Sequence, residues 1–107
     1  MKVRNIFSNI PESLPNELLK ELVSSENCKI ERIISKGHTT PEGKWYDQDK
    51  NEFVIIFKGN AELLFEENNK IIKMKEGNYI NIPSHTKHRI IKTSLKEETI
   101  WLAIHYK

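Results

Sequence analysis

The sequence contains almost no cysteine, and this and other scarcities limit the kinds of protein it can encode. Cys28 is the only cysteine among 107 residues, so no disulfide can form within the chain, and a reducing cytoplasm is the expected compartment. We expect a buried, unreactive Cys28 thiol, because no histidine adjoins it in sequence. No apolar run approaches the roughly 18 residues of a membrane span. No apolar stretch follows Met1–Arg4 either, so neither a membrane segment nor a signal peptide is predicted.

The chain also lacks a strong excess of charge of either sign. Its 17 basic and 15 acidic side chains give a formal net charge of +2, and both signs are spread along the chain without a basic block. Nucleic acid is therefore not expected as a partner. The length fits one domain with a single hydrophobic core.

One segment near the N-terminus has the spacing of a helix. Leucines recur there on one helical face, at Leu14, Leu18, Leu19 and Leu22. Ser13 can cap the first turn, and Pro15 is tolerated within it. We therefore predict a short amphipathic helix over about Leu14–Val23, within an N-terminal arm of residues 1–28 that packs on the remaining domain or on a partner subunit.

From Lys29 onward the apolar pattern changes to a period of two. The run Phe53–Phe57 is continuously apolar, as is typical of a strand buried on both faces. Turn residues such as Gly59-Asn60 and Gly77-Asn78 divide the sequence into many short segments. This pattern predicts an all-β sandwich or barrel over residues 29–107.

Two groups of residues resemble the two sequence motifs of the cupin family. They are Glu52-x6-Gly59 and Gly77-x5-Pro83-x4-His88. Cupins are small antiparallel β-barrels of the jelly-roll kind, so the resemblance implies that fold for residues 29–107, with the Glu and the His directed into the barrel. The stretch Gly37–Gln48 further resembles a subgroup of short bacterial cupins. The resemblance also implies a homodimer, because short cupins commonly pair.

The resemblance implies a divalent metal site, but two of the usual ligands are missing. Glu52 and His88 match ligand positions, whereas Tyr46 and Gln48 stand where two histidines are usual. Imidazole and carboxylate together suit Zn, Fe, Mn or Ni, and Gln48 would complete the set through its amide oxygen. The alternative is a hydrogen-bonded Glu52–His88 pair that holds no metal.

Neighbouring segments supply further candidates for the same site. Asp47 can offer a carboxylate if the backbone turns inward, and His85 can swing in from its turn, although both are less favoured as ligands. Tyr46 and His105 are the candidate catalytic residues, because each can exchange a proton. The predicted pocket wall consists of Trp45, Tyr46, Trp101 and His105, and plain core filling is an equally good explanation of its aromatic rings.

Three functions remain open from the sequence. The first is a metal-dependent enzyme that acts on a small molecule bound in the barrel. The second is a non-catalytic module that binds or senses a metabolite or a metal. The third is a metal-free epimerase-like or lyase-like cupin in which His88 or His105 acts as the base.

Overall fold

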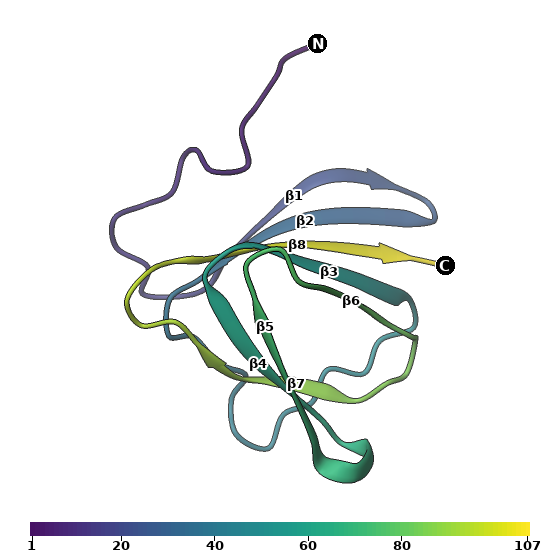
Figure 1. The fold of residues 1–107 in the computed structure, drawn as a ribbon. Coiled ribbons are helices and arrows are strands. Elements are labelled where there is room, and N and C mark those ends of the chain that lie inside the picture. The colour runs from purple at the N-terminus through teal and green to yellow at the C-terminus, as the bar shows by residue number, and fades with distance from the viewer.

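A computed structural model describes residues 1–107 as an almost entirely β protein. Eight strands form two antiparallel sheets that enclose the core, with the order β1-β2-β8-β3-β6 in one sheet and β5-β4-β7 in the other (Figure 1). Their bounds are β1 Leu18–Ser25, β2 Cys28–Ser35, β3 Asn51–Lys58, β4 Asn60–Phe65, β5 Lys70–Lys75, β6 Tyr79–Ile82, β7 His88–Thr93 and β8 Thr99–Tyr106. A single 3-10 turn, η1 (Glu67–Asn69), joins β4 to β5. The predicted antiparallel jelly-roll barrel is confirmed.

The core lies between the two sheets and follows from the alternation of side chains along each strand. In β3, Val54 and Ile56 point inward and are buried, while the residues between them are less buried. The central cluster draws on both sheets and contains Val54, Ile56, Ala61, Leu63, Met74, Ile82 and Trp101. Because successive side chains point to opposite faces, Glu52 lies on the same inward face as Val54.

The helix predicted over Leu14–Val23 is wrong, because this segment contributes strand β1. It pairs antiparallel with β2 from Leu18 opposite Ile34 to Ser25 opposite Cys28. An isolated helix of this length is marginal in water, whereas β2 without β1 would be an edge strand with unpaired backbone groups. Tertiary pairing therefore overrides the helical spacing of the leucines.

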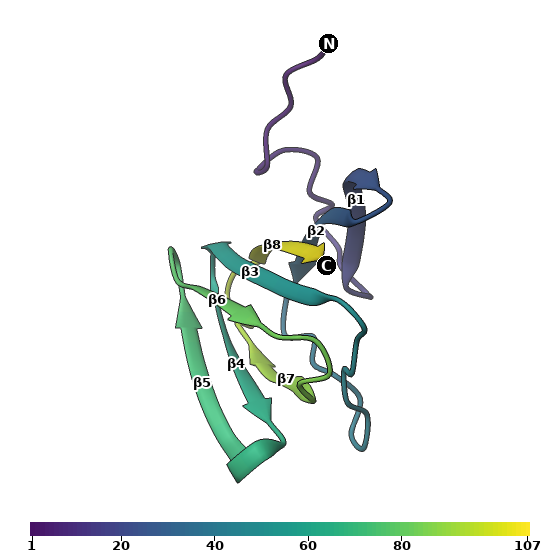
Figure 2. The same ribbon diagram turned by 90° about the vertical axis from the view of Figure 1, so that its right-hand side faces the viewer.

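The first 17 residues contain no helix or strand, and part of this arm is tied to the outer face of the larger sheet. The buried guanidinium of Arg32 donates hydrogen bonds to the backbone carbonyls of Ile6, Ser8 and Asn9, at 3.2, 2.6 and 3.4 Å. The ring of Phe7 meets that of Phe57 edge-on, with centroids 6.3 Å apart. Beyond this contact the N-terminus extends away from the barrel (Figures 1 and 2).

Two smaller observations bear on the sequence predictions. Cys28 is partly exposed, so the expected burial of its thiol is wrong. It is the first residue of β2, where the strand leaves the hairpin turn from β1. The structure contains no helix with the length and apolar character needed to cross a membrane.

Candidate functional site

A cavity of about 110 Å³ lies between the two sheets. It is smaller than the ~300–1,000 Å³ pockets that take drug-sized ligands. Its apolar lining consists of Leu19, Ile33, Tyr46, Val54, Leu63, Ile82, Ile90 and Trp101, and its polar lining of Glu17, Glu31, Gln48, Glu52, His88 and His105. A mostly apolar wall with a few polar groups is typical of a site for a small organic molecule.

Glu52 and His88 face each other in this cavity from opposite sheets. Glu52 lies on β3 and His88 is the first residue of β7, and the two meet with 3.4 Å between Oε1 and Nε2. Both side chains are buried. Because a buried charge is costly without a partner, the pair stabilises the carboxylate and the protonated imidazole together.

The His88 ring is held in one orientation by its surroundings. Its Nδ1 lies 2.8 Å from the Thr86 carbonyl oxygen, an arrangement that makes Nδ1–H the donor and directs Nε2 toward Glu52. The rings of Tyr46 and Phe65 flank the imidazole, with centroids 5.6 and 5.7 Å away. Backbone hydrogen bonds in both directions between Tyr46 and His88 place the tyrosine beside β7.

The surroundings also bias His88 toward its protonated form. Burial lowers the pKa of the His88 imidazole, but the hydrogen bond to Glu52, the Thr86 carbonyl and the negative charge of Glu52 outweigh it. The net effect is a pKa above the ordinary 6.5. The raised pKa therefore favours an imidazolium beside the Glu52 carboxylate up to a higher pH than for an ordinary histidine.

His105 and Glu31 form a second acid–base pair beside the first. The Nε2 atom of His105, on β8, lies 2.9 Å from Oε1 of Glu31, on β2. The same nitrogen is 4.0 Å from Oε2 of Glu52. Glu31, His105, Glu52 and His88 thus form one continuous row of titratable groups along the cavity.

Tyr46 presents a neutral hydroxyl to this cavity. Burial raises the pKa of the Tyr46 phenol, and the charges of Glu17 and Glu52 raise it further, against a lowering by the hydrogen bond with Thr40. A phenol with a raised pKa keeps its proton at physiological pH. Tyr46 is therefore suited to donate a hydrogen bond and unsuited to act as a phenolate.

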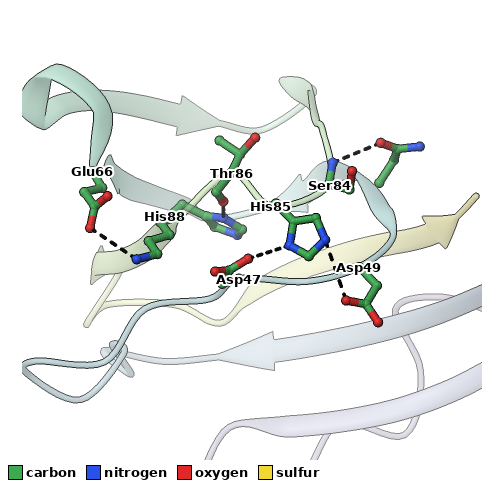
Figure 3. A network of polar contacts seen from close by, with 9 residues as sticks. Asp47, Asp49, Glu66, Ser84, His85, Thr86 and His88 are labelled. Carbon is green, nitrogen blue, oxygen red and sulfur yellow. Dashed lines mark hydrogen bonds and ion pairs between the residues drawn. The ribbon is translucent and has the colours of Figure 1, made fainter.

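Three residues predicted for the site lie outside the cavity. Figure 3 shows His85 between Asp47 and Asp49, with Nδ1 2.9 Å from Asp47 and Nε2 3.7 Å from Asp49. The His85 side chain is 65% exposed. Its positive φ of 57° at the turn and the hydrogen bond from its backbone N–H to the Gln48 carbonyl direct the ring outward.

Asp47 and His85, predicted as less favoured ligands, are therefore placed outside the cavity and against each other. Trp45, predicted as pocket wall, does not line the cavity; its ring packs against the guanidinium of Arg89, which lies 5.7 Å from the ring centroid. Adjacent residues of an extended segment point to opposite sides, so Tyr46 faces inward and Trp45 does not. Of the other predicted residues, Tyr46, Gln48, Glu52, His88, Trp101 and His105 all line the cavity.

Two acidic cavity residues were not anticipated from the sequence: Glu17 and Glu31. Glu31 shares a face of β2 with Ile33, and this period-two relation was visible. Both faces of that strand carry apolar residues, however, so the inward face could not be chosen from the pattern alone. Glu17 precedes β1 and is held by the Ser35 hydroxyl, which donates to its carboxylate at 2.8 Å and accepts from the Trp101 indole N–H at 3.2 Å.

The residues present do not form the metal ligand set that the resemblance implies. No group of three or more His, Cys, Asp or Glu side chains is placed to hold one metal ion. The Nε2 atom of His105 is engaged by Glu31, Tyr46 resists deprotonation, and the neutral amide of Gln48 is a weak donor. Metal binding stays a prediction, and the chemistry supported by this geometry uses the side chains alone.

Comparison with solved structures finds similar structures that cover most or all of this chain. A protein of Ralstonia eutropha JMP134, provisionally assigned as a mannose-6-phosphate isomerase, is 36% identical, with 100% of this chain and 99% of that chain covered and a TM-score of 0.95. A cupin superfamily protein from Desulfitobacterium hafniense DCB-2 is 17% identical over 91% of this chain and 83% of its own, with a TM-score of 0.75.

A third similar structure has the same architecture. It is an RmlC-like cupin with a double-stranded β-helix fold from Methanocaldococcus jannaschii, 21% identical over 92% of this chain and 86% of its own, with a TM-score of 0.70. At such low identity the likeness concerns the fold alone. A search with protein-family profiles and a search of curated proteins found no match.

Proposed function

The chain belongs to the cupin superfamily, and we propose that its cavity binds a small polar organic molecule. We further propose that the side chains of the cavity move a proton on that molecule. The observation that carries this proposal is the buried Glu52–His88 pair, 3.4 Å apart and facing a mostly apolar cavity. A carboxylate base beside a protonated imidazole is a matched base and acid for proton transfer next to a carbonyl group. The reaction class is that of a metal-free isomerase, epimerase or lyase.

The two residues have distinct roles in such a reaction. Glu52 removes a proton from the carbon next to a substrate carbonyl, and the electron pair of the broken C–H bond forms a carbon–carbon double bond. The carbonyl oxygen takes the Nε2 proton of His88, which gives a neutral enol and leaves a neutral imidazole. When Glu52 returns the proton to the same carbon and His88 takes back the enol proton, the result is an epimerisation. When an α-hydroxy carbonyl compound receives the proton at the former carbonyl carbon and its neighbouring hydroxyl gives its proton to His88, the result is an isomerisation; neither route involves net oxidation or reduction.

Other cavity residues support this chemistry. The Thr86 carbonyl holds the His88 ring so that Nε2 points inward, and the neutral Tyr46 hydroxyl can donate a hydrogen bond to a substrate oxygen. His105, held by Glu31 at 2.9 Å, lies 4.0 Å from Glu52 and can relay its proton. The 36% identical relative carries a provisional assignment as an isomerase, and isomerisation is one of the reactions this arrangement suits.

Hydrogen–deuterium exchange on small carbonyl compounds tests the proposal. The purified protein is incubated in D₂O with a panel of α-hydroxy and α-amino carbonyl compounds, and deuterium incorporation at the carbon next to the carbonyl is followed by NMR. We expect incorporation with the parent protein and a loss of about 100-fold or more in Glu52→Gln and His88→Gln, the usual range for a general acid or base. Glu66→Gln, an exposed glutamate near Lys87, serves as the matched control.

Two other results would redirect the assignment. Binding of a compound in the cavity without any exchange would indicate a non-catalytic binding module. Exchange that is lost on treatment with a chelator and restored by Zn, Fe, Mn or Ni would establish a metal-dependent enzyme, and metal analysis of untagged protein would identify the ion.

We also propose that the chain pairs with a second copy through the β1 edge of the larger sheet. This edge is open, and Leu22 and Val23 on it are 41% and 54% exposed. Open edges with apolar side chains are usually covered. Light scattering coupled to size-exclusion chromatography should give twice the monomer mass, and Val23→Lys should shift the protein toward monomer; a monomeric parent protein would refute the pairing.

A further inference from the structure

We infer that the cavity selects a small molecule bearing a positively charged amine and disfavours one bearing a phosphate. This inference rests on the proposed function, which places the ligand in the cavity between the sheets. It concerns the charge of the ligand, which the proposed reaction leaves open.

The charges that line the cavity are predominantly negative. Glu17, Glu31 and Glu52 contribute three carboxylates, and the only lining groups that can carry an opposing charge are the imidazoles of His88 and His105. Even with both imidazoles protonated, the lining keeps a formal charge of −1, and with both neutral it reaches −3. No lysine or arginine lines the cavity. In a partly desolvated site such an imbalance favours a cation.

Of the three carboxylates, that of Glu52 has the most remaining capacity to accept hydrogen bonds. Glu17 accepts a hydrogen bond from Ser35, and Glu31 is close to both His105, at 2.9 Å, and Lys29, at 3.8 Å. Glu52 is only 9% exposed, and the nitrogens that approach it do so at 3.4 and 4.0 Å. Strong charged hydrogen bonds are shorter, about 2.7–2.9 Å, so this buried carboxylate has room to accept a donor from a ligand.

The basic side chains near the cavity are not placed to receive a phosphate within it. Lys29 and Lys50 line an outer hollow that adjoins the cavity, but Glu31 and Asp49 line the same hollow. Arg89 packs over Trp45 and donates to the Thr40 carbonyl, outside the cavity. Phosphate sites are usually built from arginine, lysine or a helix N-terminus, and none of these reaches the cavity.

The aromatic lining is compatible with an ammonium group. Tyr46 and Trp101 both line the cavity, and aromatic faces attract cations. A protonated amine can thus contact the Glu52 carboxylate while the rest of a small molecule packs against the apolar wall.

Three probes of similar skeleton and different charge test the inference: 3-amino-1,2-propanediol as the cation, glycerol as the neutral compound and glycerol 3-phosphate as the anion. Binding to the full chain is measured by titration calorimetry, and the site by NMR signals of the Trp101 indole N–H and the His88 and His105 rings. We expect the amine to bind about tenfold more tightly than glycerol, the size expected for a hydrogen bond to a charged group. Glycerol 3-phosphate should bind more weakly than glycerol.

Variants tie this preference to the carboxylate. Glu52→Gln keeps the shape of the side chain and should abolish the preference for the amine over glycerol, whereas Glu66→Gln should retain it. Tighter binding of glycerol 3-phosphate than of the amine, with the cavity signals shifted, would overturn the charge preference and leave the cavity as the binding site. A response of the cavity signals to none of the three probes would overturn the proposed binding function together with the inference.

Discussion

The replacement of His88 by alanine tests whether the Glu52–His88 pair is a coupled charge pair or a mere contact. The substitution leaves the Glu52 carboxylate buried without its imidazole partner and removes a ring packed between Tyr46 and Phe65. Removing one partner of a buried pair typically costs about 3–5 kcal/mol. For a domain of this size, we expect the melting temperature of His88→Ala to fall by about 15 °C.

The distance between Glu52 and His88 sets an upper limit on their coupling energy. Two unit charges 3.4 Å apart attract each other with about 5 kcal/mol at an effective dielectric constant of ~20. Desolvation of both groups offsets much of this attraction, so we expect a coupling energy of about 2 kcal/mol. A double-mutant cycle with Glu52→Gln, His88→Ala and the double variant, measured by urea unfolding, gives this energy directly.

The pH dependence of the stabilisation by His88 tests the charge pair independently. The His88 pKa is raised above 6.5 in the folded protein, so the folded state binds the proton more tightly than the unfolded state does. The stabilisation is therefore fully present below pH 6.5 and is lost as the pH rises through the folded-state pKa. The difference in unfolding free energy between the parent protein and His88→Ala should be larger at acidic than at alkaline pH.

A matched control and a clear contrary result complete the experiment. His85→Ala removes an exposed imidazole beside Asp47 and should change stability by less than about 1 kcal/mol, as for other surface pairs. A coupling energy below about 0.5 kcal/mol, together with a stability difference that does not change with pH, would show that His88 and Glu52 are not a charge pair.

Three further predictions follow from particular contacts. Gly59→Ala should destabilise the protein by more than about 1 kcal/mol, because Gly59 has φ +86° and an added Cβ would lie 2.7 Å from the Thr99 Cα; unchanged urea unfolding would contradict this. Arg32→Ala should release the arm of residues 1–9, measured as faster proteolysis within it, since three carbonyls of the arm lose their donor. Spectrophotometric titration should show a Tyr46 phenol that ionises above the ordinary value of 10.0, identified as the signal lost in Tyr46→Phe; ionisation at or below that value would contradict the expected effect of burial.

Much of the barrel could be predicted from the sequence, because period two is a local property of a strand. The alternation from Lys29 onward indicated strands, and the resemblance implied that Glu52 and His88 are directed into the barrel. The structure adds that they lie on β3 and β7, in opposite sheets. The alternation also put Trp101 and His105 on one face of β8, and both line the cavity.

Features that depend on neighbouring chain segments could not be predicted in this way. The leucine spacing over Leu14–Val23 favours a helix locally, and only the open edge of β2 makes it a strand. Asp47 and His85 are turned outward by the backbone of a turn and by the hydrogen bond between their side chains, which no spacing reveals.

The cavity itself shows where sequence information ends and tertiary structure begins. The pattern of β2 establishes that Glu31 and Ile33 share a face, but apolar residues on both faces leave the inward one undetermined. The packing of the smaller sheet over the larger decides it, and so brings Glu17, Glu31 and Glu52 into one cavity with two imidazoles. The periodicity of a strand is set by its own backbone, whereas the charge inside a barrel is set by which strands close around it.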